Sequence, residues 1–197
     1  TQLPMRKFDS YLPFVPTQKE AELFISSLPD LKPKAMVSLM YSSGLRVGEV
    51  CSLRYCDIQR KNMRIHVTHS KNRSDRYAIL SQKALDILTE YWFAYNRPTG
   101  WLFPKQTDPS RPIDTFYICR HMRAHEDSLG WEHRITCHSF RHAFGTHLYE
   151  NGADLLTIKT LMGHKSLNST LLYIHLASYQ ARNVVSPFDR IGGGSLE

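Results

Sequence analysis

The stretch from residue 136 to 176 carries two histidines, an arginine and a tyrosine in a spacing that suits chemistry on a phosphate ester. His138 and Arg141 are spaced i,i+3, so both would lie on one face of a helix. Arginine presents a fixed fork of donors that matches phosphate oxygens, and histidine exchanges protons near neutral pH. Tyr173, nine residues after His164, is a potential covalent nucleophile if a neighbour takes its proton. The set predicts phosphoryl transfer without a metal ion.

Each of these residues also has an ordinary interpretation. Tyr173 could be a half-buried helix tyrosine, and His138 and His164 could be polar surface residues. His138 and His142 have the i,i+4 spacing of some zinc sites. However, no glutamate lies between them, and Arg141 on the same turn would repel a cation. We therefore expect neither a metal nor another cofactor.

A second group of motif residues lies far upstream, in the run Tyr41-Ser-Ser-Gly-Leu-Arg-Val-Gly-Glu-Val-Cys-Ser-Leu53. This run resembles the first motif of the tyrosine recombinase, or phage integrase, family. The run His138-Ser-Phe-Arg-His142 resembles the second motif, and Met162-Gly-His164 followed by Tyr173 resembles the third. The resemblance extends from about residue 12 to residue 176 and is nearest to the Xer-like and transposon integrases.

The resemblance implies a role for each motif residue in DNA strand cleavage. Tyr173 would attack a backbone phosphate to form a 3′-phosphotyrosyl link and a free 5′-hydroxyl. His138 would take the tyrosine proton, and His164 would hydrogen-bond the phosphate. Arg46 and Arg141 would hold the non-bridging oxygens, where negative charge builds up in the transition state.

The resemblance also implies that a lysine on a β-hairpin protonates the leaving 5′-oxygen. Lys71 occupies the matching position between two predicted strands, residues 63–69 and 76–80. Arg73 is a poor proton donor because its guanidinium stays charged at any ordinary pH. We expect Arg73 and Arg76 to contact DNA.

Capping signals and apolar periodicity predict the helices that position these residues. Thr17-Gln-Lys-Glu20 is a capping box that opens an amphipathic helix. Pro33 starts the next helix, which Gly44 ends. Arg46 then begins a short helix, and we expect Glu49, one turn further on, to hold its guanidinium.

The second half of the chain is also predicted to be largely helical. Ser81 caps an amphipathic helix with Ala84, Leu85, Leu88 and Trp92 as its apolar residues. Residues 108–112 form a polar turn, and residues 114–129 form another helix with Phe116 among its apolar positions. Asp154 caps a helix that ends at Gly163. The expected fold class is mainly α with a small antiparallel β-sheet (α+β), and the resemblance implies the catalytic-domain fold of tyrosine recombinases.

Composition adds expectations about partners and location. The chain has 197 residues, 42% of them hydrophobic, with a net charge of +7 and a pI near 9.3, which favours a polyanionic partner. The resemblance implies that double-stranded DNA is this partner and that the protein self-associates on it as a dimer or tetramer. No apolar run reaches membrane-spanning length and no signal peptide is visible, which predicts a cytoplasmic protein. The resemblance suggests a bacterial, phage or mobile-element origin and association with the nucleoid.

The domain organisation is predicted in four parts. Residues 1–16 resemble a linker from an amino-terminal DNA-binding domain, and residues 17–176 form the catalytic domain. Residues 177–191 form a tail that either docks on a neighbouring protomer or folds back on its own domain. The glycine-rich run 192–197 reads as a cloning scar.

The predicted function is site-specific DNA recombination or integration. One alternative is a type IB topoisomerase, which uses similar chemistry to relax supercoils. Another is a DNA-binding regulator that uses the same fold without catalysis. A metal-dependent hydrolase is disfavoured because its ligands are not grouped in the sequence. The four cysteines, at positions 51, 56, 119 and 137, are expected to be reduced, small core residues.

Overall fold

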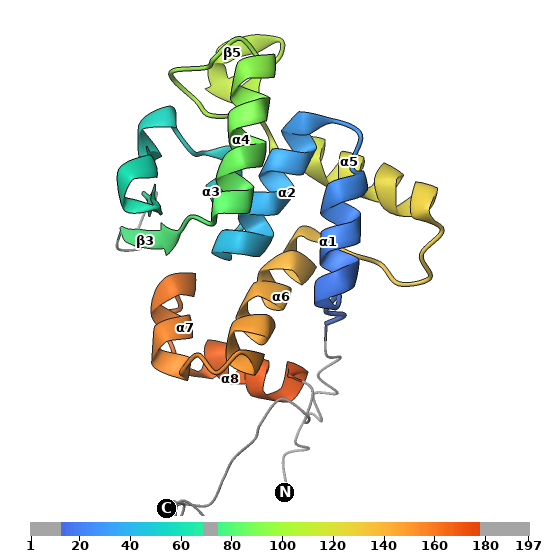
Figure 1. The fold of residues 1–197 in the computed structure, drawn as a ribbon, viewed down its shortest axis with the longest axis vertical. Helices are drawn as coiled ribbons and strands as arrows, with labels where there is room; N and C mark the ends of the chain where they lie inside the picture. Colours follow the sequence, from blue (N-terminus) through green and yellow to red (C-terminus); the bar gives the residue numbers. More distant parts are fainter. Residues whose placement is uncertain (1–12, 69–74, 178–197) are drawn as a thin grey trace, which may run out of the picture.

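The computed structural model describes residues 13–68 and 75–177, and the side chain of His175 is outside this description. Helices make up most of the described chain (Figure 1). They are α1 (Gln18–Ser27), α2 (Leu31–Ser43), α3 (Val47–Cys51), α4 (Gln82–Ala94), α5 (Thr115–Leu129), α6 (Cys137–Glu150), α7 (Leu155–Met162) and α8 (Asn168–Leu176). Short 3-10 turns lie at Tyr55–Asp57 and Arg60–Asn62. The prediction of a mainly helical fold is confirmed.

Most helix boundaries follow the predicted local signals. The capping box at Thr17 is present, with Glu20 bonded back to the Thr17 amide. Helix α2 begins at Leu31, two residues before the predicted start at Pro33, and ends at Gly44 in the left-handed conformation. Helix α7 begins after Asp154, whose carboxylate accepts from two main-chain amides, and ends at Gly163, which is also left-handed.

Helix α2 is the centre of the main core. It packs against α4 on one side and α6 on another, and it lies between them in Figure 1. Buried residues surround its axis instead of following one face, which is typical of a helix enclosed by others. They include Ala35, Met36, Val37, Leu39 and Met40. Because α2 ends at Gly44, the first motif, which starts at Tyr41, spans the end of this enclosed helix.

The predicted hairpin is present as part of a three-stranded antiparallel sheet. Its strands are β1 (Ile58–Gln59), β2 (Arg64–Val67) and β3 (Arg76–Ile79), in the order β1-β2-β3. His66 lies opposite Tyr77, and Val67 lies opposite Arg76. Strand β3 also packs against α7, so the sheet contacts the helix that precedes His164.

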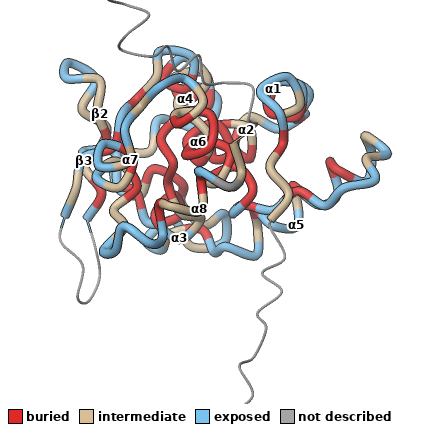
Figure 2. The backbone as a smooth tube through the Cα atoms, turned by 90° about the horizontal axis from the view of Figure 1, so that it is seen from below, coloured by how far each residue is buried: buried red, intermediate tan, exposed pale blue. Residues whose placement is uncertain are grey.

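Helices α6, α7 and α8 pack together around a second, smaller hydrophobic cluster. Its buried members are Phe144, Tyr149, Ile158, Met162 and Tyr173. Buried positions accordingly run through α6 in Figure 2. Helix α6 also packs on α2. The second and third motifs therefore lie near the C-terminal end of α2, where the first motif is located.

Several local predictions were wrong. Residues 108–112 form strand β5 (Asp108–Pro112), which pairs with β4 (Pro104–Lys105), instead of a polar turn. Tyr91, not Trp92, is the fully buried aromatic residue of α4, and its hydroxyl donates to the Leu102 carbonyl. Phe116, expected among the apolar positions of α5, is 70% exposed. The rotation of α4 and α5, set by the elements packed against them, decided the last two cases.

The cysteines divide between core and surface. Cys51 and Cys137 are buried, as expected, whereas Cys56 and Cys119 are exposed. The sulfur atoms of Cys119 and Cys137 are 3.7 Å apart. Burial raises the pKa of the Cys51 thiol to about 12. Within the described residues, no helix is long and apolar enough to cross a membrane.

Candidate active site

Arg141 is held by the C-terminal ends of two helices. Its Nη1 donates to the carbonyl of Gly44, at the end of α2, and its Nη2 donates to the carbonyl of Met162, the last residue of α7, over 2.5 Å. Carbonyls at a helix C-terminus lack helical partners and carry partial negative charge, which favours a cation there. The glycines of the first and third motifs therefore have a common role, because Gly44 and Gly163 end the two helices whose carbonyls hold Arg141.

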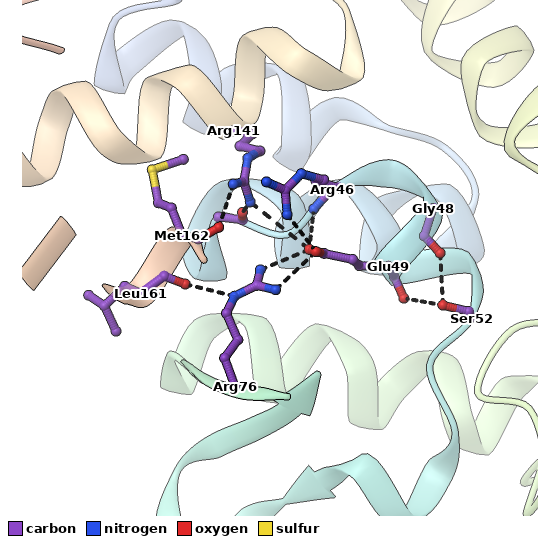
Figure 3. A network of polar contacts seen from close by, with 9 residues as sticks. Arg46, Gly48, Glu49, Ser52, Arg76, Arg141, Leu161 and Met162 are labelled. Carbon is purple, nitrogen blue, oxygen red and sulfur yellow. Dashed lines mark hydrogen bonds and ion pairs between the residues drawn. The ribbon is translucent and has the colours of Figure 1, made fainter. Parts of the chain in front are cut away.

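Glu49 lies among three guanidinium groups, as Figure 3 shows. It binds Arg46 twice, through the Arg46 amide at 2.8 Å and through Nη1 at 2.8 Å. It pairs with both terminal nitrogens of Arg76 at 2.9 and 2.8 Å. Arg141 Nη1 is 4.0 Å from the same carboxylate. The predicted contact between Arg46 and Glu49 is present, and positive charges outnumber the negative charge at this point.

Burial and charge set the protonation states in this cluster. Burial raises the pKa of Glu49, but hydrogen bonds and charge from Arg76, together with hydrogen bonds from Arg46, outweigh it and lower the pKa to about 2. Burial and the nearby Arg46 lower the pKa of Arg141 to about 10. At neutral pH the carboxylate is ionised and the guanidinium is protonated. The side chain of Arg46 is 26% exposed, so it is the arginine that faces solvent.

Tyr173 lies on α8 with its ring directly against the main chain of α6. A Cβ atom built on Gly145 would be 2.5 Å from the Cζ atom of Tyr173, so only glycine permits this approach. The residue is 1% exposed, and burial raises the pKa of its phenol to about 12, although Arg141 and Arg46 act in the opposite direction. The phenol is therefore protonated in this conformation and needs a base to become a nucleophile.

Two histidines lie beside the Tyr173 ring. The His164 ring stacks on it with centroids 6.1 Å apart, and the His142 ring is also 6.1 Å away, tilted by 56°. Burial, followed by the charge of Arg141, lowers the pKa of His164 to about 4. Burial, followed by His138, lowers the pKa of His142 to about 4. Both imidazoles are therefore neutral at physiological pH.

His164 is oriented by a buried threonine. Its Nδ1 atom lies 2.9 Å from the hydroxyl of Thr170, which is fully buried in α8. If the hydroxyl donates to Nδ1, the ring carries its proton on Nε2 and can donate a hydrogen bond to a phosphate oxygen. Thr170 was not among the predicted site residues, and no local pattern in the sequence links it to His164.

The structure brings together Arg46, Glu49, Arg141, His164 and Tyr173. His138 is exposed at the start of α6, with its ring 6.3 Å from that of His142. Among the described residues, no hydrogen bond or ring contact joins His138 to Tyr173. Lys71 and Arg73 lie outside the described residues, so their roles stay predictions.

Sequence reasoning missed the structural importance of Gly145 and the position of His142. A glycine inside a helix costs stability relative to alanine, so Gly145 was itself a signal of close packing. The predicted DNA contact of Arg76 stays a prediction. In this structure the Arg76 guanidinium is bound to Glu49. The described residues contain no group of three or more His, Cys, Asp or Glu side chains placed to hold a metal ion.

Comparison with known proteins identifies the family of this chain. The phage integrase family profile matches residues 16–180. The chain belongs to the phage integrase family, the tyrosine recombinases. A Sinorhizobium fredii protein with the provisional name integrase/recombinase y4eF is 36% identical over 187 residues, covering 95% of this chain and 74% of the relative. Tyrosine recombinase XerD of Lacticaseibacillus casei is 31% identical over 193 residues, covering 89% of this chain and 64% of the relative.

Solved structures of recombinases share the fold of this family member. The crystal structure of XerA recombinase superposes with a TM-score of 0.78 at 28% identity, covering 87% of this chain and 63% of that one. The catalytic domain of bacteriophage HP1 integrase superposes with a TM-score of 0.61 at 17% identity, covering 85% of this chain and 90% of that domain. The predicted catalytic-domain fold is confirmed. The chain spans 74% of the first relative's length and 60% of that of a second relative from Sinorhizobium fredii.

Proposed function

We propose that this chain is the catalytic part of a site-specific DNA recombinase or integrase that cleaves and rejoins strands through a 3′-phosphotyrosyl intermediate. The observation that supports this most directly is the arginine cluster beside Tyr173. Arg46 and Arg141 both act electrostatically on the Tyr173 phenol, and the cluster carries excess positive charge. Such a site can bind a phosphate diester next to the tyrosine hydroxyl. It can also stabilise the negative charge that builds up on the phosphate oxygens in the transition state.

Each group has a defined part in the proposed cleavage step. The Tyr173 oxygen forms a bond to phosphorus, its proton passes to His138, and the bond from phosphorus to the 5′-oxygen breaks. Lys71 supplies a proton to that 5′-oxygen. Arg46 and Arg141 hold the non-bridging oxygens, and neutral His164 donates a hydrogen bond to one of them. A 5′-hydroxyl of another strand reverses the step, so no cofactor is consumed.

The proton transfer requires a rearrangement from the conformation described above. Tyr173 is buried and packed on Gly145, whereas His138 is exposed, and its ring contact among the described residues is with His142, at 6.3 Å, instead of with Tyr173. We therefore propose that DNA binding moves α8 relative to the start of α6, so that the Tyr173 hydroxyl comes within reach of His138. This separates a resting arrangement, with the phenol protonated, from a reactive one.

A suicide substrate tests the proposal. DNA nicked near the cleavage point loses a short fragment after attack, so the covalent protein–DNA product accumulates. The wild-type chain should form an adduct that a denaturing gel retains, and Tyr173→Phe should bind the DNA without forming it. An adduct formed by Tyr173→Phe at the normal rate would show that another residue is the nucleophile. Chelation by EDTA should leave the adduct yield unchanged; loss restored by magnesium or zinc would support a hydrolase instead.

A plasmid relaxation assay, run beside the suicide-substrate assay, separates the alternative functions. Relaxation of supercoiled plasmid without strand exchange between sites would indicate a type IB topoisomerase. Binding of DNA by the wild-type chain without any adduct would indicate a regulator. The proposal extends to double-stranded DNA as substrate, self-association as a dimer or tetramer on it, and a place at the bacterial nucleoid. It rests on family membership and on bacterial relatives named as recombinases.

A further inference from the structure

Arg76 lies outside the three motifs, at the first residue of β3, yet it is nearly as inaccessible as Arg141. The exposed fractions of the two side chains are 8% and 6%. A buried guanidinium is costly unless protein oxygens surround it. The partners of Arg76 therefore indicate what the residue is for.

Arg76 joins two elements that carry active-site residues (Figure 3). Its Nη1 and Nη2 atoms bind the two carboxylate oxygens of Glu49 over 2.9 and 2.8 Å, and its Nε donates to the carbonyl of Leu161 over 3.1 Å. Leu161 is in the last turn of α7. The planar fork of an arginine can make these contacts simultaneously, whereas the single ammonium group of a lysine cannot.

The stem of Arg76 also lies directly against the third motif. A Cβ atom at Gly163 would be 2.7 Å from Arg76 Cδ and 2.9 Å from its Nε. Gly163 ends α7 and immediately precedes His164. The same helix end supplies the Met162 carbonyl to Arg141. A displaced Arg76 would therefore disturb the supports of Arg141 and of His164 together.

We propose that Arg76 is a positioning residue: it holds the Glu49 carboxylate and the last turn of α7, and through them fixes Arg46, Arg141 and His164 for phosphate cleavage. The inference rests on the proposed function. It differs from the DNA contact predicted for Arg76 because the guanidinium is already bound to protein oxygens.

Adduct formation and DNA affinity distinguish the two roles. We would compare the wild-type chain with Arg76→Gln, Arg76→Lys and the control Arg64→Gln. Arg64 lies on β2, so Arg64→Gln removes the same charge from the same sheet. Its guanidinium contacts Gln59 and the Tyr77 ring instead of the active-site cluster. A positioning role predicts that Arg76→Gln slows adduct formation on the order of tenfold to a hundredfold, because misplaced groups lose most of their effect. The control should react at nearly the wild-type rate.

The salt dependence of DNA binding tests the alternative role, a direct contact of Arg76 with a DNA phosphate. A positioning residue leaves the slope of log affinity against log salt unchanged in Arg76→Gln. A phosphate contact would instead reduce that slope by about one unit and weaken binding uniformly across sequences. Reduced slope with an unchanged cleavage rate at saturating DNA would overturn the positioning role.

A double-variant cycle tests whether Arg76 acts through Glu49. Arg76→Gln with Glu49→Gln should be about as slow as the slower single variant, since both remove one shared contact. The acid-side decline of the Arg76→Gln rate should also begin at a higher pH than in the wild type. This is expected because the pKa of Glu49 rises without Arg76. In the double variant, which lacks the Glu49 carboxylate, this shift of the acid-side decline to higher pH should be absent. Independent, additive losses would contradict the proposal.

Two glycine variants test the contact with α7. Gly163 and Gly130 both end helices in the left-handed region, with φ of 62° and 64°, but nothing lies within 4 Å of a Cβ at Gly130. Gly163→Ala should lower the melting temperature more than Gly130→Ala, and only Gly163→Ala should slow adduct formation. Equal effects on both properties would mean that the Arg76 contact is unimportant.

Arg76→Lys and the wild-type chain distinguish a folding defect, a failure of the positioning role and a failure of the proposed function. Arg76→Lys retains the charge and most of the stem, so it should fold even if Arg76→Gln melts early, and it should still be slow. A folded Arg76→Lys with the wild-type rate would overturn the inference. If the wild-type chain forms no adduct, the proposed function fails. If the wild type reacts and every Arg76 variant reacts equally fast, only the positioning role fails.

Discussion

Arg141 is fixed by the protein before any substrate arrives. Two of its N–H groups bind the carbonyls of Gly44 and Met162, and a guanidinium has five such groups. The remaining donors keep a set direction, so a phosphate oxygen would meet them without reorganisation. Preorganised donors of this kind contribute most where charge develops during a reaction. Arg46, which is held on one side by Glu49, would act in the same way.

We predict that Arg46→Lys and Arg141→Lys each slow strand cleavage on the order of a hundredfold or more, if one donor set contributes ~3 kcal/mol to the transition state. Lysine keeps the charge but loses the planar fork. The rate of adduct formation on a suicide substrate measures this. A rate within a few-fold of wild type would show that charge alone is sufficient.

Lys71 should respond differently from the two arginines. Lys71→Ala removes the predicted acid for the leaving 5′-oxygen, and a substrate with sulfur in place of that oxygen needs no such acid. We expect Lys71→Ala to regain cleavage on the sulfur substrate, while Arg46→Lys and Arg141→Lys stay slow. Equal failure of all three would remove Lys71 from this role, and rescue of Arg73→Ala instead would assign the acid to Arg73.

The buried histidines should make stability depend on pH. His142 and His164 have a pKa of about 4 in the folded chain, mainly because of burial, against an ordinary value near ~6.5. Between those values the unfolded chain binds more protons, so the free energy of unfolding should fall as the pH drops from ~6.5 to ~4. Urea unfolding at several pH values measures it. His164→Gln should weaken the dependence, whereas the exposed His133→Gln should not.

Helix α6 connects the two hydrophobic clusters and carries the second motif. Its inner face packs on α2, and its Gly145 receives the Tyr173 ring of α8. The position of the proposed nucleophile thus depends on one missing methyl group. Close packing leaves no room to absorb an added carbon without moving a helix.

Gly145→Ala tests this dependence. Helix propensity alone predicts a gain of about 1 kcal/mol, because alanine is a better helix former than glycine. The structure predicts the opposite, since the new Cβ would lie 2.5 Å from the Tyr173 ring and α8 would have to move. We expect a lower melting temperature and a changed adduct yield.

Gly48→Ala is the matched control for this substitution. Gly48 also lies within a helix, α3, and a Cβ there meets nothing within 4 Å. It should leave the melting temperature unchanged or raise it slightly. A stabilised Gly145→Ala with normal adduct formation would show that α8 adapts freely.

The molecule as a whole is basic, with a net charge of +7. Arginine and lysine bind DNA phosphates largely by releasing counterions, so we predict DNA affinity that falls steeply with salt. If about six phosphates are neutralised, the loss between 50 and 200 mM salt would be on the order of a thousandfold. Fluorescence anisotropy with duplexes of unrelated sequence measures the slope. Affinity that is insensitive to salt would contradict a phosphate-dominated interface.

Local signals in the sequence were sufficient for much of the fold and part of the site. The capping box at Thr17, the Asp154 cap and the left-handed glycines at 44 and 163 depend on residues within one helical turn of each other. The contact of Arg46 with Glu49 is also local. The three motifs therefore indicated the family and most of the cluster without any coordinates.

Contacts between distant segments were decided only by the tertiary structure. The Arg76 fork reaches Glu49 and Leu161, which lie 27 and 85 residues away in sequence, and no periodicity encodes such a contact. The closeness of Tyr173 to Gly145, the exposure of Phe116 and the pairing of β4 with β5 likewise depend on how helices rotate and pack. Residue spacing determines which side chains share a face, but the neighbour that meets this face is chosen by the packing of the whole core.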